Sequence, residues 1–110
     1  MAQKTGYVKK VVKKLVDGLK SRDIKVNTLI LYGSYARGTQ RTDSDIDIAV
    51  ISSSFDRKNI LQRQEVLGEI IYPLKEPIEA LGYSWREFKH RHPLSFLSEI
   101  LATGKIVYRE

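Results

Sequence analysis

Apolar side chains recur at steps of three and four residues through the first part of the chain. They are Tyr7, Val8, Val11, Val12, Leu15, Val16 and Leu19. Such steps follow the 3.6-residue period of an α-helix, and most of the intervening lysines fall on the opposite face. The pattern predicts an amphipathic helix that packs on a core through one apolar stripe.

Two short segments after this helix have the patterns of β-strands. Residues 27–32 read N-T-L-I-L-Y and end at Gly33, which is typical of a buried strand. Residues 45–50 read D-I-D-I-A-V and alternate strictly between apolar and other side chains. Asp45 and Asp47 are therefore predicted to share one face of the second strand.

The rest of the chain predicts two further strands and three helices. Residues 57–72 have apolar side chains at mostly helical spacing and precede Pro73. We expect a third strand over residues 78–83, with Pro77 at its start or at an edge of the sheet. The other predicted elements are a short helix over 85–90, a helix over 94–102 and a strand over 105–108. Without internal repeats or linkers, residues 1–110 are interpreted as one α/β (α+β) domain, a small mixed β-sheet flanked by helices.

The composition is that of an ordinary globular protein. Of the 110 residues, 42% are hydrophobic and 29% are charged, which excludes disordered and low-complexity classes. The absence of cysteine excludes disulfide frameworks, thiolate metal sites and a cysteine nucleophile. The apolar runs are far shorter than the ~20 residues that cross a bilayer, and the first residues do not resemble a signal peptide. We expect a cytoplasmic protein without membrane association.

The excess positive charge is confined to the start of the chain. The net charge is +6, and residues 1–25 hold eight Lys or Arg against two Asp, whereas residues 26–110 hold eleven of each sign. A solvated helix surface explains this distribution, and so does a patch that binds nucleic acid or an acidic partner.

Candidate chemistry gathers in residues 33–47, GSYARGTQRTDSDID. Gly33 ends a strand without a Cβ in the way of a ligand, and Ser34 can open a helical turn whose free N–H groups bind phosphate. By itself, a Gly-Ser pair is also a common turn and helix cap. Asp45 and Asp47 lie ~7 Å apart along one strand face, where two like charges are costly unless a cation compensates them or the strand end reaches solvent.

A divalent cation would suit the two aspartates. Mg²⁺ prefers carboxylate oxygens, and two such ions can hold the attacking and leaving oxygens of a phosphoryl transfer. A third carboxylate from a neighbouring strand would complete the site. Glu79 is the candidate because it alternates with Ile78 and Ala80 and can face the same way as the aspartates. A surface glutamate would fit the same pattern, and Glu76 is expected to face away.

These residues resemble a known motif. Gly33-Ser34, ten intervening residues, Asp45-Ile46-Asp47 and the later carboxylate of Glu79 resemble the DNA polymerase beta-type nucleotidyltransferase superfamily. More closely, the run GSYARGTQRTDSDIDIAV and the chain length resemble the minimal nucleotidyltransferases, which are often partners of HEPN-domain proteins in two-gene prokaryotic cassettes. The resemblance covers almost the whole chain. It implies the polymerase beta-type nucleotidyltransferase fold and transfer of a nucleoside monophosphate to a hydroxyl or similar acceptor, with release of pyrophosphate.

The resemblance also implies roles for these positions. Gly33 and Ser34 would bind the β- and γ-phosphates of the nucleotide. Asp45 and Asp47 would hold two Mg²⁺ ions. Glu79 would help to hold the catalytic ion and would orient or deprotonate the acceptor hydroxyl. The third acid is often Asp in these enzymes, so the longer Glu79 is a departure that puts the metal position in doubt.

Two arginines, two histidines and several aromatic side chains have alternative interpretations. Arg37 and Arg41 lie inside the motif, either as cations that bind phosphate or as solvated loop arginines. His90 and His92 are assigned a surface or capping role in preference to zinc binding. Trp85, Phe88 and Phe96 are predicted to belong to the core. Tyr35 and Tyr83 lie near the candidate site in the sequence without an assigned ligand.

We therefore expect a Mg-dependent nucleotidyltransferase that uses ATP. The resemblance suggests that the acceptor lies on a second protein, a HEPN-type toxin that is itself modified, with this chain as its antitoxin. One alternative is a non-catalytic antitoxin subunit that only binds its partner. Another is a module that binds nucleic acid through the basic N-terminal helix, by the side chains of Lys9, Lys10, Lys13 and Lys14.

Overall fold

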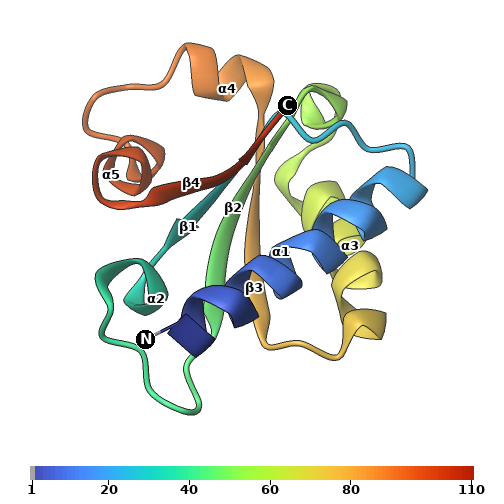
Figure 1. The fold of residues 1–110 in the computed structure, drawn as a ribbon. Coiled ribbons are helices and arrows are strands. Elements are labelled where there is room, and N and C mark those ends of the chain that lie inside the picture. The colour runs from blue at the N-terminus through green and yellow to red at the C-terminus, as the bar shows by residue number, and fades with distance from the viewer. Residues whose placement is uncertain (1) are drawn as a thin grey trace.

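A computed structural model describes residues 2–110, with side chains from Gly6 onward. Its strands are β1 (Thr28–Tyr32), β2 (Ile46–Ser52), β3 (Ile78–Ser84) and β4 (Lys105–Arg109). They form a sheet of order β3-β2-β1-β4 (Figure 1). β1 pairs antiparallel with both β2 and β4, whereas β2 and β3 are parallel. The sheet is mixed, as the sequence predicts.

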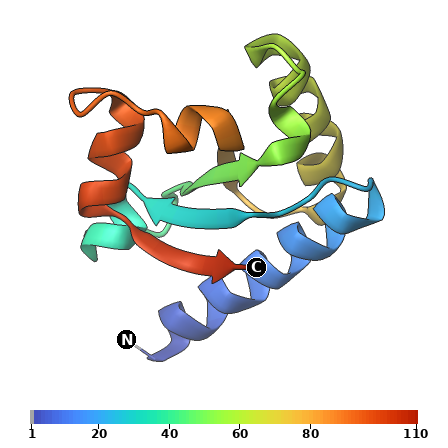
Figure 2. The ribbon, with the colours of Figure 1, turned by 90° about the horizontal axis from the view of Figure 1, so that it is seen from above.

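Helices lie on both faces of this sheet. The helices are α1 (Ala2–Ser21), α2 (Ser34–Arg37), α3 (Ile60–Ile71), α4 (Trp85–Lys89) and α5 (Phe96–Thr103), with short 3₁₀ turns at Ser53–Phe55 and Tyr72–Leu74. α1 and α3 pack on one face, and α4 and α5 pack on the other. Figure 2 shows α1 and α5 on opposite sides of the strands. No helix within residues 2–110 combines the length and the apolarity that a bilayer span requires.

The face under α1 and α3 holds most of the core. Val11, Leu15 and Leu19 of the predicted stripe are fully buried, and they pack in one cluster with the strand residues Ile48 and Val50. Burying such side chains stabilises the fold by about 1.5–3 kcal/mol each. The alternation of β2 thus directs one set of side chains into this core and leaves the other set on the opposite face.

Two predictions about element ends and burial differ from the structure. The helix predicted over residues 57–72 begins only at Ile60, because Asn59 caps it by accepting a hydrogen bond from the N–H of Gln62 at 2.8 Å. Phe96 was predicted to be core, and this is wrong, since its side chain is 52% exposed. Phe96 is the first residue of a short helix at the border of the smaller core cluster, where one side of its ring remains in solvent.

Candidate active site

Asp47 and Glu79 are direct neighbours on the face opposite α1. In the register of the sheet, Asp47 pairs with Tyr32 of β1 on one side and with Glu79 of β3 on the other. Neighbouring strands lie ~4.8 Å apart, so the three side chains form a row across three strands. Asp47 is half-buried and Glu79 is exposed, because α4 and α5 cover other parts of this face. Two carboxylates far apart in the sequence therefore meet at one place on the sheet.

The carboxylate of Asp47 lies against the backbone of Gly33. Gly33 follows β1 directly and has a φ of 74°, which is in the left-handed region that favours glycine. A Cβ at this position would come within 2.1 Å of Oδ2 of Asp47. Both the backbone conformation and the close approach therefore require glycine at position 33.

The turn after Gly33 presents unpaired backbone donors. The carbonyl of Gly33 accepts hydrogen bonds from the N–H groups of Ala36 and Arg37 at 3.1 and 3.2 Å. No acceptor among the described residues bonds the N–H of Ser34 or of Tyr35, as expected for the first residues of a helix. These donors stand beside Gly33 and can bind an anion such as a phosphate group.

The electrostatics of the site centre on Asp47. Burial raises the pKa of the Asp47 carboxyl, and the negative charges of Glu79 and Asp45 raise this pKa further. Arg37 opposes them and lowers the pKa of Asp47. In the ion pairs of residues 6–110, none of the three carboxylates has a basic partner. The site thus carries negative charge that the described residues do not neutralise.

The loop before β2 carries Asp45 and Arg41 at its surface. The predicted strand begins one residue too early, because β2 starts at Ile46 and Asp45 is an exposed residue in front of it. The backbone N–H of Arg41 donates to Oγ of Ser44 at 2.7 Å, which closes a tight turn in this loop. The structure brings Arg37 near the carboxylates and records no interaction of the Arg41 side chain with them. The function predicted for Arg41 remains a prediction.

The donor chemistry of the site fits a hard divalent cation. All candidate ligands are carboxylate oxygens, which Mg²⁺ prefers, and the charges of Glu79 and Asp45 add to burial in raising the pKa of Asp47. Within residues 6–110, no three Asp, Glu or His side chains converge closely enough to hold an ion as they stand. Asp45 and Glu79 are exposed, so rotation of their side chains is the movement that would bring them toward Asp47.

Residues from α5 reach the site, and the sequence did not indicate this. A cavity of about 200 Å³ lies beside Gly33 and Arg37, and its far wall includes Phe96 and Glu99 of α5. The ring of Phe96 meets that of Tyr32 edge-on, with the centroids 6.0 Å apart. Burial and the charge of Asp47 raise the pKa of the Tyr32 hydroxyl to about 12, so it stays protonated and can donate a hydrogen bond. No sequence signal marked Phe96 or Glu99, because the exposure of Phe96 is visible only in the structure.

Uncompensated carboxylates beside a glycine turn with free N–H groups define an enzyme that acts on phosphate groups. The chain belongs to the polymerase beta nucleotidyltransferase family, because the family model described as "Polymerase beta, Nucleotidyltransferase" matches residues 13–110. The chain is therefore a nucleotidyltransferase, in a family that generally uses a nucleoside triphosphate and a divalent metal.

A curated relative and two solved structures agree with this assignment. "Putative protein adenylyltransferase MJ0604" of Methanocaldococcus jannaschii is 29% identical over 100 residues, which cover 90% of this chain and 96% of that protein. A "putative nucleotidyltransferase" of Sulfolobus solfataricus has a TM-score of 0.71 and 16% identity, covering 99% of this chain and 86% of that chain. A toxin-antitoxin crystal structure with AMP-PNP contains a chain with a TM-score of 0.63 and 23% identity, covering 89% of this chain and 73% of that chain. At these identities, the two solved structures show that the fold is shared.

Proposed function

We propose that this protein transfers AMP from ATP to a hydroxyl group on a partner protein, with Mg²⁺ as the metal. The observation that carries the proposal is the pairing of Asp47 with Glu79 in register, directly against Gly33. The name of the curated relative, a protein adenylyltransferase, supports both the nucleotide and the kind of acceptor. We propose further that the partner is a HEPN-type toxin and that the chain acts as its antitoxin. The toxin-antitoxin assembly among the fold neighbours supports this part.

The chemistry of this transfer is a displacement at the α-phosphorus of ATP. The acceptor oxygen forms a bond to the α-phosphorus, the bond from that phosphorus to the bridging oxygen of the β-phosphate breaks, and pyrophosphate leaves. The acceptor hydroxyl loses its proton, and we propose that the carboxylate of Glu79, which is exposed beside Asp47, accepts it. Arg37 lines the cavity beside Gly33 and acts on the charge of Asp47, and its guanidinium would pair with phosphate oxygens of a bound nucleotide.

Two Mg²⁺ ions would neutralise the phosphates and the developing charge when they are bound. Asp45 and Asp47 would hold both ions, and Glu79 would contribute to the one nearer the acceptor. Gly33 and Ser34 would cradle the β- and γ-phosphates through backbone N–H groups. These roles agree with the excess of negative charge around Asp47, which a bound cation would relieve.

A protein acceptor suits the shape of the site. The cavity beside Gly33 measures about 200 Å³, below the ~300 Å³ at which pockets for small ligands begin. Asp45, in the loop before β2, and Glu79, on the edge strand β3, are both exposed. A site this shallow cannot enclose an acceptor, so the acceptor must bring most of its own binding surface.

The test is transfer of label from ATP. The purified chain is incubated with Mg²⁺, ATP labelled at the α-phosphate, and the HEPN-domain protein of the same organism. We expect label on the HEPN-domain protein, and loss of labelling with Asp47→Asn. Asp43→Asn is the matched control, because Asp43 is an exposed aspartate in the same loop and should leave labelling unchanged. Labelling that survives Asp47→Asn would refute the site. Stable binding of the partner without any labelling would favour a non-catalytic antitoxin.

A further inference from the structure

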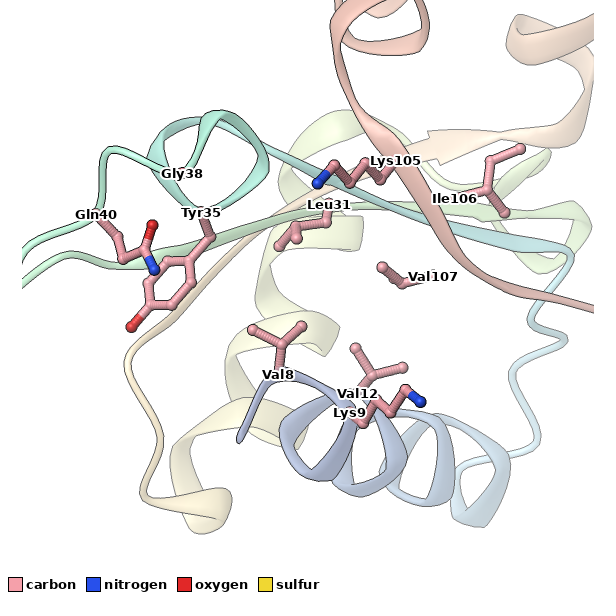
Figure 3. A pocket seen from close by; sticks show the side chains of 10 residues that line it. All are labelled: Val8, Lys9, Val12, Leu31, Tyr35, Gly38, Gln40, Lys105, Ile106 and Val107. Atoms are coloured by element: carbon pink, nitrogen blue, oxygen red, sulfur yellow. The ribbon is translucent and has the colours of Figure 1, made fainter. Parts of the chain in front are cut away.

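A larger hollow lies on the other face of the sheet, between α1 and β4. This groove has a volume of about 520 Å³. Figure 3 shows Val8 and Val12 of α1 pointing toward Leu31 of β1 and Val107 of β4 across the space. Four aliphatic side chains from three elements therefore form its floor and walls, which suits apolar side chains of a ligand.

The rim of the groove carries positive charge without acidic partners. Lys9 and Lys105 line the groove and are exposed, and neither takes part in an ion pair among residues 6–110. Two other lysines of α1 are already paired, Lys13 with Asp17 at 3.3 Å and Lys14 with Glu76 at 2.7 Å. Lys9, which lines the groove, is therefore a lysine of α1 whose charge no acidic side chain among residues 6–110 pairs with.

One end of the groove has an unmet hydrogen-bonding group. Tyr35 of α2 and Gln40 of the following turn close this end (Figure 3). The side-chain carbonyl oxygen of Gln40 is buried and has no hydrogen-bond partner among the described residues. Buried polar atoms are nearly always paired, so this amide makes the end of the groove polar, in contrast to its aliphatic floor.

The groove borders the free edge of the sheet. β4 is the last strand in the order β3-β2-β1-β4, so its outer edge pairs with no strand of residues 2–110. Ile106 of β4 borders the groove through its backbone, and Figure 3 shows its side chain directed away from α1, as its pairing with Ile30 requires. An extended peptide can pair its backbone with such an edge and place alternate side chains in the adjoining groove.

We propose that this groove docks an extended segment of the acceptor protein in which acidic and aliphatic residues alternate. The inference rests on the proposed function, since the segment belongs to the protein that receives AMP. Aliphatic side chains occupy the floor, acidic side chains meet Lys9 and Lys105, and a polar residue of the segment lies at the end formed by Tyr35 and Gln40.

The charges and the lining distinguish this occupant from two others. A second copy of the chain, placed by a two-fold axis, would bring Lys9 and Lys105 toward the same residues of its partner, and the like charges would repel. A nucleic acid would satisfy the lysines but would leave the aliphatic floor without an apolar ligand, because nucleic acids bind through phosphate contacts and aromatic stacking. An acidic and aliphatic segment satisfies both parts of the groove.

The groove is also close to the candidate active site. α2 contributes Tyr35 to the groove, and the same four-residue helix starts at the phosphate cradle of Gly33 and Ser34. A segment docked along β4 would therefore have one end at α2, the helix that follows Gly33. The docked protein would have to pass α2 and cross to the other face of the sheet to bring its hydroxyl to Asp47 and Glu79.

Charge reversal tests the groove with the HEPN-domain protein as the probe. We expect the double variant Lys9→Glu and Lys105→Glu to weaken binding of this protein about tenfold or more in calorimetry, and to raise its KM in AMP transfer more than it lowers kcat. ATP binding should not change. The control variant, Lys13→Glu with Lys25→Glu, makes the same change of charge at exposed residues outside the groove and should bind within about twofold of wild type.

The outcomes separate this inference from the proposed function. If wild type binds the HEPN-domain protein, the groove variant does not, and no AMP is transferred, the docking site is supported and the proposed activity is wrong. If AMP is transferred and the groove variant binds the HEPN-domain protein as tightly as wild type does, the docking site is wrong and the proposed activity is supported. A wild-type chain that does not bind the HEPN-domain protein would also overturn the docking site.

Photo-crosslinking identifies the occupant directly. Tyr35→p-benzoylphenylalanine places a photoreactive aromatic group at the end of the groove, and mass spectrometry of the crosslinked complex reports which segment it reaches. We expect a segment of the HEPN-domain protein that alternates Asp or Glu with Val, Leu or Ile. A crosslink to a basic segment, to a second copy of this chain or to co-purified RNA would overturn the proposal.

Discussion

The two faces of the sheet use adjacent residues of β2 for different purposes. Ile48 is fully buried under α1 and α3, whereas Asp47, one residue earlier, lies half-buried on the other face beside Glu79. The second face is covered only in part, since α4 and α5 bury Ala49 and Ile51 but leave the carboxylates accessible. A residue that stabilises the core, Ile48, is therefore adjacent in the chain to a candidate catalytic residue, Asp47. Single substitutions can change stability and activity independently.

The largest expected effect falls on the chemistry of the open face. Glu79→Gln keeps the shape of the side chain and removes its charge, so it should lower the rate of AMP transfer about 10³-fold, which corresponds to ~4 kcal/mol of transition-state stabilisation. Because Glu79 is exposed, the free energy of unfolding should not change. Steady-state kinetics and urea denaturation measure the two quantities.

The control for this variant lies three residues earlier in the chain. Glu76 accepts hydrogen bonds from Tyr7 at 2.9 Å and Lys14 at 2.7 Å, both on α1. Glu76→Gln should therefore reduce stability and spare the transfer step. If Glu79→Gln transfers AMP at the wild-type rate, the assignment of the third carboxylate is wrong.

The next effect falls on the covered face. Ile48→Ala removes a fully buried side chain and should lower the free energy of unfolding by ~3 kcal/mol, since the surrounding core relaxes only in part. The folded fraction should keep its affinity for ATP. Ile106→Ala makes the same change at a half-exposed residue and should cost less than ~1 kcal/mol. Equal losses in the two variants would contradict the contrast between the faces.

The third and smaller effect concerns two glycines. Substituting each by alanine distinguishes the cost of backbone strain from the displacement of the Asp47 carboxylate. Gly33 and Gly38 both have a φ of 74°, but a Cβ at Gly33 meets Asp47 at 2.1 Å, whereas a Cβ at Gly38 meets nothing within 4 Å. Gly33→Ala and Gly38→Ala should each lose ~1–2 kcal/mol of stability from the left-handed conformation. Only Gly33→Ala should also lose binding of Mg²⁺ and ATP, as measured by calorimetry. Similar nucleotide binding by both variants would show that Gly33 does not position Asp47.

The smallest effect is a dependence of stability on pH. The pKa of Asp47 is raised in the folded protein, so folding favours the protonated carboxyl, and stability falls as the pH rises through this pKa. Asp47→Asn cannot ionise and should be more stable than wild type above that pH. Thermal melts across the acidic to neutral range, without metal, measure the difference. Mg²⁺ should then stabilise wild type and not the variant, and a variant that melts below wild type throughout would contradict the raised pKa.

The elements and their faces could be predicted from the sequence because their signals are local. The stripe of Val11, Leu15 and Leu19 is fully buried, and the strict alternation of residues 45–50 places Asp47 and Ile48 on opposite faces of β2. Each predicted helix and strand is present, with ends that differ by a few residues where caps such as Asn59 intervene. Phe96 was misplaced because apolar character alone does not show whether a residue at the end of a short helix reaches the core.

What the sequence determined by itself is the set of helices and strands, the faces of their side chains, and the motif that marks Gly33, Asp45 and Asp47 as candidates. These follow from interactions among residues that are close along the chain. Only the tertiary structure decided that Glu79 pairs with Asp47, that Phe96 stands beside Tyr32, and that Val8 and Val107 enclose one groove. Strand register and packing between distant segments depend on the fit of the whole core, and no local pattern encodes that fit.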